Sequence, residues 1–308
     1  MAVDLLCMGE PMLEFSRLPA EPDGRRLYLE GHGGDTSNAA IAAARQGASA
    51  GYITALGRDA AGDSFMRLWA EEGVDTSTVI CSPDRRTGIY FITHGPRGHE
   101  FLFYRAGSAA SAYAPRDVPE DAIAKARVLF ASGISQGISE TAADAVFHAV
   151  EVARRHGVLV AYDTNFRPRL WPAARAAAVI HAAIRQADIA FPGLDDVLAL
   201  TGLTDLDAIL DFYLALGPEI VVLKMGADGA YLGLPDRRLM IPPSPCNPVD
   251  ATGAGDTFCG SFLARLIAGD APEEAARYAA TAAALSTTGY GAVAPIPRAA
   301  QVRAALGR

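Results

Sequence analysis

The hydrophobic residues of this chain form short apolar runs that alternate with stretches of helical spacing. The apolar runs have the length of buried strands and lie at residues 3–8, 50–56, 128–131, 158–162, 189–191 and 220–223. The helical stretches lie between them at residues 39–46, 63–72, 141–155 and 173–185. Strands that alternate with helices form βαβ units, in which helices cover both faces of a parallel sheet. The pattern therefore predicts an α/β fold with a mostly parallel sheet flanked by helices.

Two segments break this alternation and predict a second, smaller β-sheet. Within residues 87–106, two runs of strand-forming residues flank a Gly-Pro-Arg-Gly hairpin signal at residues 95–98. Residues from about 14 to 32 carry two prolines and leave the core before the chain returns. No linker, internal repeat or low-complexity tract divides the chain. We therefore expect a single domain of residues 1–308, from which the two segments project as insertions.

Composition and charge narrow the classes of function. Half of the 308 residues are hydrophobic and the formal net charge is −8, so a nucleic-acid partner is not expected. No stretch reaches the roughly 18 consecutive apolar residues of a membrane span, and no secretory signal is recognisable. The 4 cysteines form no CxxC or Cys/His cluster, which favours reduced thiols in a cytoplasmic protein over a metal or disulfide site.

A glycine-rich turn at residues 250–258, Asp-Ala-Thr-Gly-Ala-Gly-Asp-Thr-Phe, is the most specific stretch of the chain. From Asp256 onward the apolar residues recur every fourth position, so the turn leads into a helix. The N–H groups of Gly253, Ala254 and Gly255 at that helix start can hold an anion. Asp256 beside them is placed to accept a proton from an attacking hydroxyl. The Gly-Ala-Gly-Asp core alone is explained equally well by a capped helix.

A second glycine turn precedes the helical stretch at residues 39–46. It contains Gly33 and Gly34 and is followed by Asn38. The turn lacks the G-x-G-x-x-G order of a dinucleotide site, because Thr36 holds the last glycine position. The Walker A sequence is also absent, which disfavours a P-loop nucleotidase.

Both turns resemble signatures of the ribokinase-like (pfkB) carbohydrate kinases, and the resemblance covers nearly the whole chain. Residues 250–258 match D-T-x-G-A-G-D-x-F except at Ala251, and the second turn matches GGxxxN. The resemblance implies a ribokinase-like fold in which the small β-sheet is a lid over the sugar. It also implies ATP and Mg²⁺ as cofactors, Asp256 as the catalytic base and residues 253–255 as the cradle of the transferred phosphoryl group.

The same resemblance assigns further binding residues. Gly33 and Gly34 would let the sugar lie against the backbone, and Asn38 would bond a sugar hydroxyl. The residues that would face ATP are Asn165, Lys224, Gly226, Gly229 and Thr252. Without the resemblance, residues 224–229 are equally a tight hairpin turn leading to a strand at 230–234. Asp250 is a candidate ligand of a monovalent cation such as K⁺, and no other metal ligand is identified. The resemblance also implies a homodimer, because family members often dimerise through their lids.

Within the family, two strings resemble the 2-keto-3-deoxygluconate kinase branch. They are Phe101–Ser108, similar to F-Y-x-R-x-G-S-A, and Asp163–Arg167, similar to D-x-N-x-R. In that branch two arginines address the acid end of the substrate, which assigns Arg105 and Arg167 to a carboxylate. Tyr90 also fits the branch as a substrate contact. Considered alone, both arginines would be ordinary solvated loop residues.

Several departures from the family pattern leave alternatives open. Residues 193–196, Gly-Leu-Asp-Asp, replace the Asn-x-x-Glu motif that organises the metal's water shell. Phe103 replaces a tyrosine, Glu14 stands where an aspartate is common, and residues 289–292 lack an acidic residue. We therefore expect an ATP-dependent kinase for a primary hydroxyl of a sugar acid, with a fructokinase or other neutral-sugar kinase as the alternative. A non-catalytic sugar or nucleoside sensor is the remote alternative, against which the intact Asp256 argues.

Overall fold

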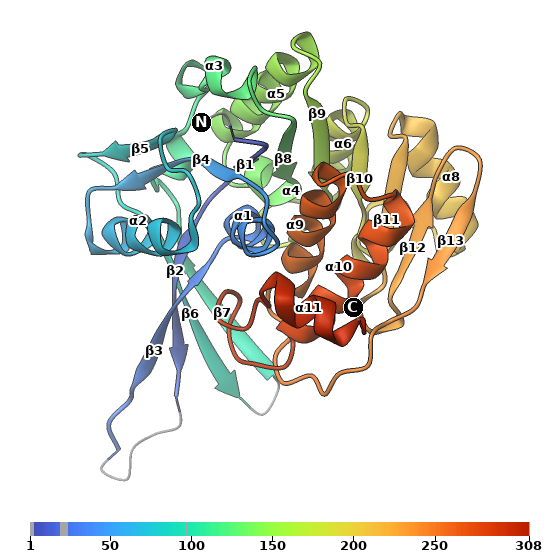
Figure 1. Cartoon of the computed structure of the whole chain (residues 1–308). Helices are drawn as coiled ribbons and strands as arrows, with labels where there is room; N and C mark the ends of the chain where they lie inside the picture. Colours follow the sequence, from blue (N-terminus) through green and yellow to red (C-terminus); the bar gives the residue numbers. More distant parts are fainter. Residues whose placement is uncertain (1–2, 19–23, 96–97, 308) are drawn as a thin grey trace.

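The computed structural model describes residues 3–18, 24–95 and 98–307 of the chain. The main sheet contains β1 (Leu5–Met8), β4 (Ala50–Gly57), β5 (Val79–Ser82), β8 (Val128–Ser132), β9 (Leu159–Asp163), β10 (Ile189–Phe191), β11 (Ile220–Lys224), β12 (Ala230–Gly233) and β13 (Arg238–Ile241). Their order is β13-β12-β11-β10-β9-β8-β1-β4-β5 (Figure 1). Neighbours from β11 to β5 pair in parallel, whereas β12 and β13 form an antiparallel edge. The predicted mostly parallel sheet is confirmed.

Helices cover both faces of this sheet because its strands alternate between two cores. On β1, Leu5 and Cys7 join one buried cluster, and Leu6 and Met8 join the other. The first cluster includes residues of α1 (Asp35–Arg45), α2 (Ala60–Glu72), α9 (Ala254–Ile267) and α10 (Pro272–Ser286). The second includes residues of α3 (Glu120–Ile123), α5 (Glu140–Arg155), α6 (Ala173–Ile184), α7 (Leu194–Thr201) and α8 (Leu206–Leu216). The remaining helices are α4 (Gly133–Gly137), α11 (Ala299–Ala305) and the short turns η1 (Ala110–Ala112), η2 (Pro115–Asp117) and η3 (Gly226–Asp228).

The small β-sheet projects from one side of the main body (Figure 1). Its strands are β2 (Met12–Arg17), β3 (Tyr28–Gly33), β6 (Gly88–Gly95) and β7 (Gly98–Tyr104), in the order β3-β2-β6-β7. The strands β6 and β7 pair antiparallel, and β2 pairs parallel with β6. The small sheet predicted from the two segments is confirmed. The turn residues Pro96 and Arg97, and both prolines of the first segment, lie outside the described residues.

Two helices begin earlier in the chain than the sequence predicted. Helix α1 begins at Asp35, directly after the glycine turn, rather than at residue 39. Helix α2 begins at Ala60, because the Asp59 side chain caps it by accepting a bond from the N–H of Gly62 at 2.8 Å. Helices α7, α8, α10 and α11 were not predicted from the sequence.

The packing of α9 against α1 fixes the position of the first turns of both helices. A Cβ atom at Gly260 would lie 2.1 Å from the carbonyl oxygen of Ala39, so only glycine allows this close approach. The two helices begin beside the carboxyl ends of β1, β8, β9 and β11, as the contacts of Thr36 with Gly9, Asp35 with Ser132 and Cys259 with Asp163 show. Ligands of open α/β sheets bind at that edge, so the loops that follow these strands are the candidate ligand-binding region.

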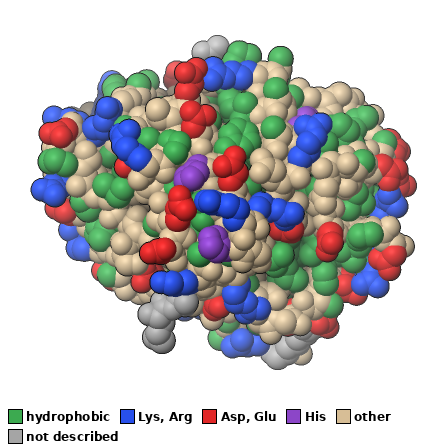
Figure 2. Space-filling view, turned by 90° about the horizontal axis from the view of Figure 1, so that it is seen from above, with side chains coloured by type: hydrophobic (Ala, Val, Ile, Leu, Met, Phe, Trp, Pro, Cys, Tyr) green, Lys and Arg blue, Asp and Glu red, His purple; other side chains and the backbone are tan. Residues whose placement is uncertain are grey.

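On the face shown in Figure 2, acidic and basic side chains are interspersed. Within the described ranges, no helix combines the length and the apolar character that crossing a membrane requires.

Candidate active site

Asp256 lies in the first turn of α9 and is held by a residue from α1. The helix is preceded by Gly253, whose φ of 76° lies in the left-handed region that favours glycine. The Asn38 amide nitrogen donates a hydrogen bond of 2.8 Å to Oδ2 of Asp256. The Oδ1 atom of Asn38 is buried without a partner among the described residues, so it can accept a bond from a ligand hydroxyl. The structure thus brings together two residues that sequence analysis assigned to catalysis and to sugar binding.

The surroundings of Asp256 suit it to accept a proton. Burial of its carboxylate, followed by repulsion from the charge of Asp35, raises the pKa of Asp256 to about 7. The Asn38 hydrogen bond and the positive charge of Lys224 act in the opposite direction. A general base works best when its pKa lies near the operating pH.

The predicted anion cradle forms only in part. The N–H of Ala254 donates a 3.2 Å bond to the carbonyl oxygen of Ala251, so it is already engaged. The N–H groups of Gly253 and Gly255 have no hydrogen-bond partner among the described residues. The ammonium nitrogen of Lys224 would lie 3.6 Å from a Cβ atom at Gly255, so a positive charge accompanies the helix start. Two backbone donors, the helix dipole and Lys224 therefore make this point attractive to an anion.

Lys224, at the end of β11, is held in place by Asp163 at the end of β9. The distance between Lys224 Nζ and Asp163 Oδ2 is 2.5 Å, and only 17% of the lysine side chain is exposed. Burial favours the neutral amine, but the charge of Asp163, its hydrogen bond to the lysine and the charges of Cys259 and Asp196 together outweigh burial and raise the pKa of Lys224 above its usual range. The lysine predicted to face ATP is thus a fixed cation at the sheet edge.

Asp35 is a buried carboxylate of the site that sequence analysis did not select. Its Oδ2 atom accepts bonds from the Ser132 hydroxyl and, at 2.9 Å, from the Asn165 amide. Its Oδ1 atom is buried without a partner within the described ranges. Burial raises the pKa of Asp35, and the charge of Asp163 adds to the effect. The only sequence signal was an aspartate directly after two glycines. Asn165, assigned to the nucleotide, here contacts Asp35 and has a φ of 29°.

Gly33, Gly34 and Tyr90 form the side of the site that faces the small sheet. A Cβ atom at Gly33 would lie 2.4 Å from the Tyr90 hydroxyl oxygen, and one at Gly34 would lie 2.6 Å from the carbonyl oxygen of Glu10. Gly34 also has a φ of 112°. The Tyr90 hydroxyl donates to the buried carboxylate of Glu14. Both glycines are therefore required for the close approach of the backbone.

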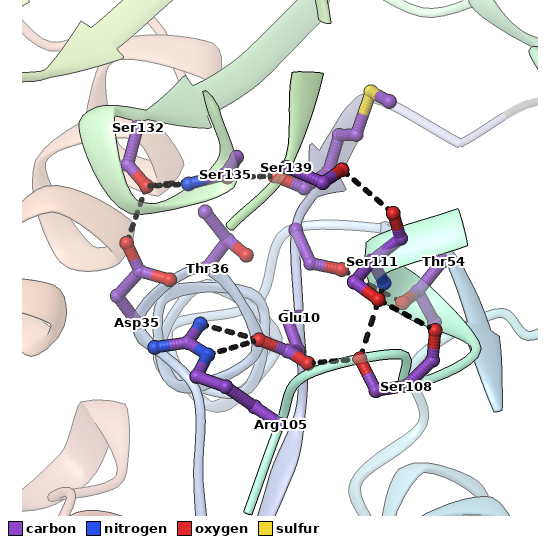
Figure 3. Close-up of polar contacts among 12 residues, drawn as sticks. Glu10, Asp35, Thr36, Thr54, Arg105, Ser108, Ser111, Ser132, Ser135 and Ser139 are labelled. Carbon is purple, nitrogen blue, oxygen red and sulfur yellow. Dashed lines mark hydrogen bonds and ion pairs between the residues drawn. The ribbon is translucent and has the colours of Figure 1, made fainter. Parts of the chain in front are cut away.

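The two arginines assigned to a substrate carboxylate have different environments. Arg105 donates through Nε to Oε2 of Glu10 at 2.7 Å and forms an ion pair with the same carboxylate (Figure 3). Arg167 is exposed, and its Nη1 donates to the backbone carbonyl of Phe166 at 3.0 Å. The two arginines therefore differ, because a buried acid already pairs with Arg105.

The remaining predicted residues lie in two turns. Gly226 and Gly229 occupy the turn between β11 and β12 with φ values of 59° and 90°. The Asp250 carboxylate accepts a 2.6 Å bond from the Thr252 hydroxyl and a 2.9 Å bond from the N–H of Gly291. Asp250 thus connects the loop before α9 with the loop after α10. Over the part of the chain that the structure describes, no group of three or more His, Cys, Asp or Glu residues could hold a metal ion.

Comparisons with known proteins show which proteins this chain resembles. A family model described as pfkB family carbohydrate kinase matches residues 4–299. The 2-dehydro-3-deoxygluconokinase of Thermoproteus tenax is 32% identical over 307 residues, which cover 97% of this chain and 93% of that protein. Fructokinase-1 of Oryza sativa subsp. japonica is 30% identical over 286 residues, 89% of this chain and 88% of that protein. A solved structure of a PfkB protein from Polaromonas sp. JS666 superposes with a TM-score of 0.89 at 30% identity, covering 98% of this chain and 100% of that one.

Proposed function

Since this chain belongs to the pfkB family of carbohydrate kinases, we propose that it transfers the γ-phosphoryl group of ATP to a primary hydroxyl of a sugar acid, 2-keto-3-deoxygluconate. This compound is also called 2-dehydro-3-deoxygluconate. The observation that carries the kinase assignment is the position of Asp256, which is held by Asn38 beside the anion-attracting start of α9.

In the proposed mechanism, the substrate hydroxyl lies against Asp256 and loses its proton to that carboxylate as its oxygen attacks the γ-phosphorus of ATP, while the bond from that phosphorus to the leaving ADP breaks. The N–H groups of Gly253 and Gly255, the α9 dipole and Lys224 stabilise negative charge on the transferred group. These donors suit the phosphates of ATP, and Mg²⁺ bound to the phosphates would neutralise further charge. Positioning and charge stabilisation provide most of the catalysis in phosphoryl transfer.

The sugar-acid assignment is supported by Arg105 and Arg167 together with similar proteins named 2-dehydro-3-deoxygluconokinase. A guanidinium matches a carboxylate with two parallel hydrogen bonds. A neutral sugar such as fructose is the competing substrate, because Fructokinase-1 of rice has similar identity. The intact Asp256 disfavours a non-catalytic sensor.

The remaining parts of the proposal concern cofactors and assembly. Mg²⁺ accompanies ATP, and a monovalent cation such as K⁺ would bind near Asp250. The small sheet acts as a lid over the sugar, and two chains form a homodimer through the outer face of this sheet. The aromatic contact of Phe91 with Tyr104 lies on that face, and Tyr104 is 58% exposed. We place the enzyme in the cytoplasm.

The proposal is tested by measuring ADP release with a panel of sugars and sugar acids, with an Asp256→Asn preparation as the control for contaminating kinases. We expect the highest kcat/KM for 2-keto-3-deoxygluconate. Replacing Arg167 by Ala should lower kcat/KM for the acid about 10-fold or more and change that for fructose little. Faster phosphorylation of fructose or ribose by the wild-type enzyme would rule out the acid assignment. Arg167 is a cleaner target than Arg105, whose removal would also leave the buried Glu10 unpaired.

A further inference from the structure

Glu10 is a fully buried carboxylate whose bonds hold one arginine of the site. It follows β1, and none of its side chain is exposed, whereas 15% of the Arg105 side chain is exposed. Oε2 accepts from Nε of Arg105 at 2.7 Å and pairs with Nη2, and Oε1 accepts from the Ser108 hydroxyl at 2.6 Å. Figure 3 shows the guanidinium with one side against Glu10. Both oxygens of Glu10 are therefore bonded to residues of the segment that follows β7.

The orientation of this pair leaves part of Arg105 available. A guanidinium has five N–H donors in a rigid fork, so it can bind one carboxylate through its Nε–Nη2 edge and another through its Nη1–Nη2 edge. Glu10 occupies the first edge. In Figure 3 the third nitrogen lies on the side away from Glu10, and within the described ranges it has no hydrogen-bond partner.

Arg105 is connected through Phe103 to Tyr90, on the small-sheet side of the site. Its guanidinium carbon lies 5.9 Å from the centre of the Phe103 ring, and Phe103 stacks on Tyr90 at 5.6 Å. The Tyr90 hydroxyl in turn lies against Gly33. Arg105 thus belongs to the layer of the small sheet that faces the glycine turn and Asp256.

We propose that Glu10 is a positioning residue, which fixes Arg105 through one edge of its guanidinium so that the other edge meets the carboxylate of the substrate. The proposal rests on the proposed function, because it assigns a role only if the substrate is an acid. Ser108 supports the same arrangement by orienting the second oxygen of Glu10.

Two physical effects of Glu10 oppose each other, and this makes the proposal testable. As a charge, Glu10 cancels the positive charge of Arg105 and should weaken the attraction of any anion. As a fixed acceptor, it removes the rotational freedom of a long side chain before the substrate binds. If positioning dominates, neutralising Glu10 weakens the binding of the acid. If charge compensation dominates, the same change strengthens it.

The experiment is a double-mutant cycle of Glu10→Gln and Arg105→Gln, assayed with 2-keto-3-deoxygluconate and with fructose. The Gln side chain at residue 10 keeps the size of Glu and can still accept from Arg105 and contact Ser108. We expect Glu10→Gln to lower kcat/KM for the acid about 10- to 100-fold, mainly through KM. The kcat/KM for fructose should change less than about 3-fold, below the cost of one hydrogen bond. In the Arg105→Gln background, Glu10→Gln should not change the acid-to-fructose ratio further, since Glu10 acts through Arg105.

Glu72→Gln is the matched control, because Glu72 also forms an ion pair with a largely buried arginine, Arg45, whose carbonyl contacts lie in residues 293–296. It should lower stability without changing the ratio. An unchanged or increased ratio in Glu10→Gln would overturn the positioning role while leaving the acid assignment intact. Additive effects in the cycle would also overturn it. A wild-type enzyme that prefers fructose would overturn the acid assignment and this inference together.

Discussion

At the scale of single residues, Asp256 carries the proposed chemistry. Replacing it by Asn keeps the size of the side chain and an oxygen that can accept from Asn38, but removes the base. We expect kcat to fall by roughly 10²–10⁴, the range that general-base catalysis contributes. Affinity for ATP, measured by equilibrium titration, should change little, because backbone N–H groups and Lys224 provide the charge at the anion site. A variant that keeps the wild-type kcat would remove Asp256 from the mechanism.

The raised pKa of Asp256 predicts how activity depends on pH. The carboxylate must be ionised to accept a proton, so kcat/KM should rise with pH through a midpoint near its pKa of about 7. The Asn38 amide stabilises the ionised form, so Asn38→Leu should move the midpoint to higher pH. The measurement is a pH profile of kcat/KM for both enzymes. An unchanged midpoint in the variant would show that another group controls the profile.

The residues of the site differ in how far the sequence could reveal them. Asp256 and its glycine turn are contiguous, so their chemistry can be recognised directly. The partners of Glu10 lie 95 and 98 positions away, and Asn165 lies 130 positions from Asp35. Such contacts depend on how the strands and the small sheet are placed in space. The sequence therefore could not reveal that Arg105 is already paired or that Asp35 lies in the site.

At the scale of elements, the sequence predicted those helices and strands that hydrophobic periodicity and glycine turns mark. Helix α5 and the buried parallel strands are long enough, or apolar enough, to be recognised, whereas the partly exposed edge strand β5 was not predicted. Helix α8 carried both end signals, an Asp205 cap and Gly217, and could have been assigned. The antiparallel pairing of β12 with β13 could not, because an edge strand depends on its neighbour more than on its own residues.

The small sheet is the element for which we predict a change on ligand binding. Its polar bonds to the main body include Arg169 to the carbonyl oxygen of Phe101 at 2.8 Å and His32 to Ser64 at 3.0 Å. Segments that close over ligands come from the less stable parts of a fold. We expect amide hydrogen exchange in β6 and β7 to slow when substrate and nucleotide bind together. Strand β8 and α5 serve as internal controls, and equal exchange in β6 with and without ligands would contradict a closing lid.

At the scale of the whole molecule, the site lies at the carboxyl ends of the parallel strands, whose two faces are covered by different buried clusters. The helices α1 and α9 belong to one buried cluster, while α5 and α6 belong to the other. Helix α1 supplies Asp35, helix α9 supplies Asp256 and the end of β9 supplies Asp163 to one small region. Carboxylates gathered in this way repel one another, so the arrangement that favours catalysis should lower the stability of the unliganded protein.

This cost predicts a pH-dependent stability that Asp256→Asn should reveal. The pKa of Asp256 is about 7 in the folded protein, against an ordinary value of 3.8. Between these values the native state binds a proton that the unfolded state lacks, so this residue's contribution to stability is fully present below pH 3.8 and is lost as pH rises through about 7. The variant has no charge to bury. At pH 8 its free energy of unfolding should exceed that of the wild type by on the order of 1 kcal/mol or more, and the difference should shrink towards pH 4.

Urea unfolding of the unliganded proteins at both pH values measures this difference. Asp59→Asn provides a control of opposite sign, because backbone N–H bonds to its carboxylate outweigh the effect of burial and lower the pKa of Asp59. A carboxylate with a lowered pKa stabilises the fold at pH values above its ordinary pKa, and this stabilisation is lost as pH falls. The variant lacks the carboxylate, so it should be less stable than the wild type at pH 8. If Asp256→Asn were also less stable than the wild type at pH 8, the carboxylate would be stabilised in the folded protein rather than strained. Its role as a base with a raised pKa would then have to be abandoned.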